Sequence, residues 1–162
     1  MRRGAFALAT AALVVPVTLA GQGAASAGPE RIKSPAIGMN APIKKVPVKD
    51  GGLAIGKDPR KVYVWKHGDP PCDSSGSSVY AGHAWSKGDG VADEWRDLRS
   101  GDIIKLPGCK FEVEKVEQWS KAKTKKKMKR LYRVDGPPLA YLVGCLPGNY
   151  GKRVIITARL ID

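Results

Sequence analysis

The stretch LAYLVGCLPGNYGKRVIITARL, residues 139–160, decides the fold class of this chain. It holds two runs of aliphatic and β-branched residues, 139–145 and 153–160, separated by turn residues. Short runs of this kind, bounded by Pro and Gly, are typical of β-strands. With the period of two of a strand, the second run has two faces: Arg153, Ile155, Thr157 and Arg159 on one, and Val154, Ile156, Ala158 and Leu160 on the other.

Further short runs of strand-forming residues occur upstream, at 32–43, 62–65, 78–83, 103–106 and 111–119. In the last of these runs, the period of two slips between the apolar positions 113 and 116, which predicts a β-bulge. Turn signals such as Asp50-Gly51-Gly52 lie between the runs. About seven or eight short strands predict a mainly β fold, a single closed barrel in which helix is limited to short turns, including one near 92–99.

The composition fits one exported or surface domain. The chain has 162 residues, 43% of them hydrophobic, so it is not a disordered chain. Its formal charge is +13, from 28 basic and 15 acidic side chains. This excess suggests an anionic partner, such as a wall polymer or a membrane surface, or only solubility near a negative surface. The run 121–130 is strongly basic, but it lacks the interleaved aromatic residues that stack nucleic-acid bases, so we exclude nucleic acid.

The N-terminus resembles an export signal. Arg2 and Arg3 precede an uncharged stretch, 4–20, and Ala25-Ser26-Ala27 fits the small-residue cleavage pattern. We expect residues 1–27 to be a signal peptide, or else an uncleaved N-terminal membrane anchor, and residues 28–162 to form the folded β-barrel domain. The protein is then exported to the extracellular face of the cell, where it is secreted or membrane-anchored.

Three cysteines follow the signal segment: Cys72, Cys109 and Cys145. Exported cysteines tend to pair, and three cannot all pair within one chain, so one thiol is left over. Cys72 lies in a Pro-rich loop and Cys109 in a Pro-Gly turn, which makes them the candidate disulfide. The alternatives are two unpaired thiols or a bridge that includes Cys145.

Three residues are candidates for chemistry. Cys145 ends an apolar strand and precedes a loop, the position where reactive groups usually lie, although most cysteines of this kind are structural. His83 also ends an apolar strand and can serve as acid and base for a cysteine nucleophile. Arg153 can donate to an oxyanion, although an Arg at a strand start is usually a surface cation.

The order and setting of these residues resemble the sortase family. The segments that carry the resemblance are Ser78–His83, Leu142–Cys145, Tyr150–Ala158, Ile37–Ile43 and Leu98–Asp102. Together they extend from about Ile32 to the C-terminus. The compact form is closest to the sortases of classes E and F of high-GC Gram-positive bacteria.

The resemblance implies a sortase β-barrel and a cysteine transpeptidase. In that reaction the Cys145 thiolate attacks a Thr–Gly-type bond in a C-terminal, LPxTG-like sorting signal, and an amine resolves the acyl-enzyme. His83, Cys145 and Arg153 fall on the catalytic positions of the family. The partners would be a protein substrate and an amine acceptor, either a peptidoglycan precursor or a pilin, and we expect no metal and no cofactor.

Two features depart from the family pattern. Gly144 stands where the family usually has Thr, and the loop between Cys145 and Arg153 is short. Two other functions remain. One is an inactive sortase-like barrel that binds the wall through its cationic surface, which Gly144 and the basic run fit. The other is an exported cysteine hydrolase that uses water in place of the amine, which the sequence does not separate from a transpeptidase.

Overall fold

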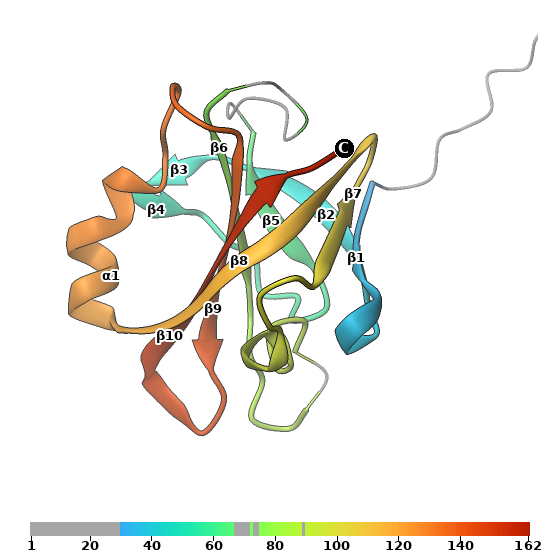
Figure 1. Ribbon diagram of the computed structural model, residues 1–162. Coiled ribbons are helices and arrows are strands. Elements are labelled where there is room, and N and C mark those ends of the chain that lie inside the picture. The colour runs from blue at the N-terminus through green and yellow to red at the C-terminus, as the bar shows by residue number, and fades with distance from the viewer. Residues whose placement is uncertain (1–29, 67–71, 73–74, 89) are drawn as a thin grey trace, which may run out of the picture.

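The computed structural model describes residues 30–66, 72, 75–88 and 90–162 (Figure 1). Within these ranges the strands are β1 (Arg31–Ser34), β2 (Met39–Val46), β3 (Val48–Lys49), β4 (Gly52–Leu53), β5 (Val62–Trp65), β6 (Ser77–Gly82), β7 (Ile103–Leu106), β8 (Cys109–Ser120), β9 (Leu139–Leu146) and β10 (Asn149–Leu160). The helical segments are η1 (Pro35–Ile37), η2 (Trp95–Asp97), α1 (Lys121–Lys127) and η3 (Met128–Arg130). The expected signal segment 1–27 and His67 lie outside the described residues.

Eight strands close into one barrel in the order β1-β2-β5-β6-β9-β10-β8-β7, which confirms the predicted mainly β fold. The pairs β2–β5 and β6–β9 are parallel, and the other neighbouring strands of the barrel run antiparallel. Parallel strands end at the same edge of a sheet, so β6 and β9 bring two chain segments far apart in sequence to one end of the barrel.

Local sequence explains the two irregularities of β10. Thr157 pairs with Lys115 and Ala158 with Val113, so Glu114 has no partner in β10, and the bulge predicted for this part of the chain is confirmed. The strand also begins earlier than expected, at Asn149, before Arg153. The reason is a tight turn with Gly148 at φ 76°, which lets Asn149 pair with Leu146 before the register shifts.

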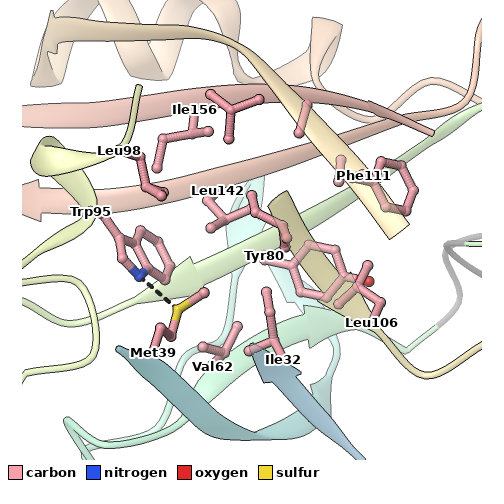
Figure 2. Packing of buried hydrophobic residues seen from close by; sticks show 14 of the residues in the cluster. Ile32, Met39, Val62, Tyr80, Trp95, Leu98, Leu106, Phe111, Leu142 and Ile156 are labelled. Carbon is pink, nitrogen blue, oxygen red and sulfur yellow. Dashed lines mark hydrogen bonds between the residues drawn. The ribbon is translucent and has the colours of Figure 1, made fainter. Parts of the chain in front are cut away.

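The barrel interior is a closely packed apolar core (Figure 2). Trp95, from η2, is fully buried in it, and its indole Nε1 donates a hydrogen bond to Met39 Sδ at 3.2 Å. The inner faces of β9 and β10 supply Leu142 and Ile156, both fully buried. Burying an aliphatic side chain of this size is worth about 1.5–3 kcal/mol. The core therefore fixes which face of each strand is left to point outward.

A second apolar cluster lies on the outer face of the same sheet. Its buried members are Val79, Trp119, Leu131, Val143 and Ile155. Helix α1 and η3 lie beside this face, next to the β3–β4 hairpin (Figure 1). The helix begins at Lys121 because the Ser120 hydroxyl accepts a hydrogen bond from the backbone N–H of Lys123 at 3.1 Å.

A disulfide joins Cys72 to Cys109, the pairing that the sequence favoured, and Cys145 is a free thiol. The bridge spans 37 residues. In the chain-entropy description, closing a loop of this length stabilises the fold by about 4 kcal/mol. In the part of the chain that the structure describes, no helix is long and apolar enough to span a bilayer.

Candidate active site

The parallel pairing of β6 and β9 places His83 beside Cys145. Gly82 and Gly144 are direct partners in this pair. His83 follows Gly82, and Cys145 follows Gly144, so both residues lie one step further at the same end of the sheet. Since successive side chains of a strand alternate between faces, both point away from the face that Gly82 and Gly144 present to the core.

The antiparallel pairing of β9 and β10 places Arg153 on the other side of Cys145, as its direct partner. Side chains directly opposite in such a pair have Cβ atoms about 4.5–5.5 Å apart and share a face. Val154, the next residue, is fully buried in the core, so Arg153 points outward. Strands β9 and β10 thus carry Cys145 and Arg153 on one outer face, and His83, the first residue after the end of β6, lies beside them.

All three residues line one pocket of about 190 Å³. Val79 and Val143 line it from the sheet, Leu53 from β4, and Met128 and Tyr132 from η3 and the residues after it. The surface also has larger hollows, of about 540 and 530 Å³, which do not include the free thiol. The smaller pocket is the candidate active site because it alone of these three combines a thiol, an imidazole and a guanidinium.

The His83 ring is held by a main-chain acceptor. Its Nε2 lies 2.6 Å from the Gly56 carbonyl oxygen, and because a carbonyl only accepts, Nε2 carries the proton. In the neutral ring, Nδ1 is then the nitrogen that is free to exchange a proton. Tyr63 holds this arrangement: its ring packs edge-on against His83 at 6.1 Å, and its hydroxyl donates to the Asp58 carbonyl at 3.0 Å.

Part of the Arg153 guanidinium is hydrogen-bonded to the connection between β9 and β10. Its Nη1 donates to the carbonyl oxygens of Tyr150 and Lys152, each at 3.0 Å. A guanidinium has five N–H donors, and no described residue accepts a hydrogen bond from Nε or Nη2. The short connection therefore fixes the group in place and leaves donors for an oxyanion.

Packing accounts for glycine at position 144. A Cβ at Gly144 would lie 2.7 Å from the Ala92 Cβ and 3.1 Å from Trp95 Cε3. A threonine would therefore collide with the segment 92–95 inside the barrel. The missing side chain belongs to the core face, opposite the face of Cys145, so packing explains the glycine.

The sequence did not point to Gly56, Met128 or Tyr132 as parts of this site. Gly56 acts through its backbone, which no side-chain pattern reveals. Met128 lies in the run 121–130, which was singled out only for its charge, and Tyr132 lies just after that run. The Tyr132 hydroxyl is buried without a hydrogen-bond partner, and burial raises the pKa of Tyr132 to about 12. Tyr132 therefore lines the pocket while its hydroxyl stays protonated and buried. Within the described ranges, no group of three or more His, Cys, Asp or Glu side chains is placed to hold a metal ion.

Comparison with known proteins gives structural matches alone. No protein-family model matches the chain, and no curated protein matches its sequence. Among solved structures, sortase C-1 from Actinomyces oris matches with a TM-score of 0.65 and 23% identity, over 82% of this chain and 71% of that one.

Two further sortases give similar values. Sortase A of Listeria monocytogenes has a TM-score of 0.64 at 14% identity, with 82% of this chain and 86% of that chain covered. A sortase D5 transpeptidase from Clostridium perfringens has a TM-score of 0.62 at 21% identity, with 83% and 79% covered. The fold of this chain is the sortase fold.

Proposed function

We propose that the protein is a sortase-type cysteine transpeptidase, with Cys145 as nucleophile, His83 as acid and base, and Arg153 as oxyanion donor. The observation that carries this proposal is the pairing of three strands that puts these residues side by side on one face, in one pocket. The sortase fold supports it, since this fold places the pocket on the outside of the barrel, where a peptide can reach it.

The geometry fits a two-step acyl transfer. The Cys145 thiolate attacks the scissile carbonyl, and the negative charge that forms on its oxygen is stabilised by Arg153 Nη2 or Nε. As the C–N bond breaks, imidazolium His83 gives the Nδ1 proton to the leaving amine, while Nε2 stays bonded to the Gly56 carbonyl. In the second step Nδ1 takes a proton from the incoming amine, which attacks the thioester carbon and releases Cys145.

The finer assignments belong to the same proposal. The substrate is a protein with an LPxTG-like sorting signal, and the acceptor is an amine of a peptidoglycan precursor or a pilin. The enzyme works outside the cell, secreted or held at its N-terminus, as the export signal suggests. We assign it to the class E and F enzymes of high-GC Gram-positive bacteria because the chain is compact.

Two other functions compete with this proposal. Gly144 and the basic run 121–130 were the features that fitted an inactive wall-binding barrel. The packing of Gly144 against Ala92 and Trp95 gives the glycine another reason, and the basic run still fits that function. A cysteine hydrolase would use the same three residues with water as acceptor. Only the acceptor separates hydrolysis from transpeptidation.

The decisive experiment incubates the purified protein with Leu-Pro-x-Thr-Gly peptides, with and without an added amine such as triglycine. Mass spectrometry should show the acyl-enzyme on the peptide containing Cys145 and the amine-ligated product. Cys145→Ala should form neither species. Full cleavage by Cys145→Ala would refute the nucleophile assignment, and a hydrolysed product alone, even at high amine concentration, would favour the hydrolase.

A further inference from the structure

A strongly basic segment adjoins the candidate active site. It consists of α1 and η3, Lys121–Arg130, and is called the basic segment below. Seven of its ten residues are cationic and none is acidic: Lys121, Lys123, Lys125, Lys126, Lys127, Lys129 and Arg130. Within the part of the chain that the structure describes, none of the seven forms an ion pair. The charge excess of the protein is therefore concentrated here, with the Glu117 carboxylate near Lys123 as a partial counter-charge.

Helix stability explains only part of this charge. Basic side chains in the last turn, such as Lys125, Lys126 and Lys127, interact favourably with the helix dipole. Lys121 and Lys123 stand in the first turn, where a cation is unfavourable, and that turn has no acidic residue. Lysines four residues apart on one helix also repel each other. The first-turn lysines thus oppose the helix that carries them, so helix stability does not account for them.

The basic segment is also part of the wall of the Cys145 pocket. Met128, within the segment, and Tyr132, just after it, both line that pocket. Lys127 and Arg130 also line a separate hollow of about 540 Å³. Its other charged lining residues are Arg133 and one carboxylate, Glu117, and Trp119 forms part of its wall. The ammonium groups of Lys123 and Lys127 lie 4.9 and 5.3 Å from the centroid of the Trp119 ring. Two of the cations are therefore gathered at the hollow.

We propose that the basic segment selects protein substrates that carry acidic residues beside the scissile bond. The inference rests on the proposed function, because it assumes that a peptide occupies the Cys145 pocket. A seven-residue helix is about 10 Å long, a distance that an extended peptide covers in about three residues. A substrate bound at Cys145 and passing Met128 therefore brings aspartate or glutamate side chains, within a few positions of the cleaved bond, to the lysines.

An anionic wall polymer is the competing partner for this charge. The substrate is favoured because the basic segment shares residues with the wall of the pocket, so a chain leaving the pocket on this side meets the lysines first. A polymer spread over the segment would instead cover the opening beside Met128.

The test compares two peptides that share one sorting motif and differ only in three flanking residues, Asp and Glu in one and Asn and Gln in the other. We expect kcat/KM for the acidic peptide to be at least tenfold higher at 50 mM salt, mainly through a lower KM. The difference should shrink at 500 mM salt, where exposed charges are screened. Dissociation constants of both peptides for Cys145→Ala, measured by fluorescence anisotropy, should show the same order.

Two matched variants remove three exposed lysines each. Lys125→Gln/Lys126→Gln/Lys129→Gln keeps good helix formers and should lower the preference for the acidic peptide at least fivefold. Lys33→Gln/Lys44→Gln/Lys105→Gln changes β1, β2 and β7, and should retain the preference.

The outcomes separate this inference from the proposed function. If neither peptide is cleaved, the proposed function fails, and the binding constants still decide the charge preference. Equal binding and cleavage of the two peptides would overturn the inference. A second result would also overturn the inference: polyglycerol phosphate binds through Lys125, Lys126 and Lys129, and the two peptides show no difference. This result would assign the basic segment to the wall polymer.

Discussion

Gly82 and Gly144 face each other across the parallel pair β6–β9, and the indole of Trp95 lies against both. A Cβ at Gly82 would lie 2.8 Å from Trp95 Cη2, and a Cβ at Gly144 would lie 3.1 Å from Trp95 Cε3. One buried aromatic ring thus occupies the space that two side chains would need. The residue after each glycine, His83 or Cys145, points to the opposite face, where the pocket lies.

The first prediction concerns this contact. Gly144→Thr should destabilise the fold by about 1–3 kcal/mol, because the added atoms overpack the core against Ala92 and Trp95. Urea unfolding followed by tryptophan fluorescence measures the loss. Gly52→Ala is the matched control, since a Cβ there has no neighbour within 4 Å and its φ is not in the left-handed region. If Gly144→Thr is as stable as the wild type, the segment around Trp95 can move to accommodate the threonine without a loss of unfolding free energy.

The second prediction concerns the oxyanion donor. Arg153→Ala should lower kcat by about 100- to 1000-fold, the usual effect of removing one preorganised donor, while the peptide dissociation constant changes little. Single-turnover acylation and equilibrium binding measure the two effects separately. Lys152→Ala, which removes the neighbouring exposed cation, should keep kcat within about twofold. A loss of affinity in Arg153→Ala with unchanged acylation would make Arg153 a binding residue.

The third prediction concerns the proton on His83. The neutral ring should be the Nε2–H tautomer, because the Gly56 carbonyl can only accept. The chain has two histidines, so in His67→Gln the ¹⁵N resonances of the remaining ring report His83 directly. Gly56→Ala places a methyl group 2.9 Å from the Tyr63 hydroxyl oxygen, which should shift the loop, mix the tautomers and lower kcat. A predominant Nδ1–H tautomer in the protein with Gly56 intact would contradict this arrangement.

The fourth prediction concerns alkaline stability. Burial raises the pKa of Tyr132 to about 12, from about 10 in the unfolded chain. Its contribution to stability is therefore fully present below pH 10 and is lost as the pH rises from 10 to 12, where the unfolded chain ionises first. Between pH 9 and 11, the free energy of unfolding of Tyr132→Phe should fall less than that of the wild type. Urea unfolding at each pH measures this difference.

At pH 7 the same substitution should cost little, because the buried hydroxyl has no hydrogen-bond partner to lose. Tyr150→Phe, at an exposed position, is the control and should follow the wild type at every pH. A steeper alkaline loss in Tyr132→Phe than in the wild type would mean that the hydroxyl forms a stabilising contact.

Local sequence patterns were sufficient to predict much of the fold. Alternation in 153–160 separated the core residues Val154 and Ile156 from the outward Arg153, because a strand has a period of two whatever its neighbours are. The slipped alternation near Glu114 predicted the bulge for the same reason. The predicted strand boundaries were less accurate. The sequence predicted that the last strand begins at Arg153, but β10 begins at Asn149, because residues with no strand pattern of their own pair with β9 across the turn.

The sequence by itself determined the strand-rich class, the outward face of Arg153 and the odd number of cysteines, since each depends on residue type and spacing alone. Only the tertiary structure decided that β6 and β9 pair in parallel with Gly82 opposite Gly144, that the Gly56 carbonyl accepts from His83, and that the basic segment adjoins Cys145. The Gly82–Gly144 and Gly56–His83 contacts join residues 62 and 27 positions apart, and Met128 of the basic segment lies 17 positions before Cys145. These contacts depend on how the whole barrel closes, which no local sequence pattern reveals.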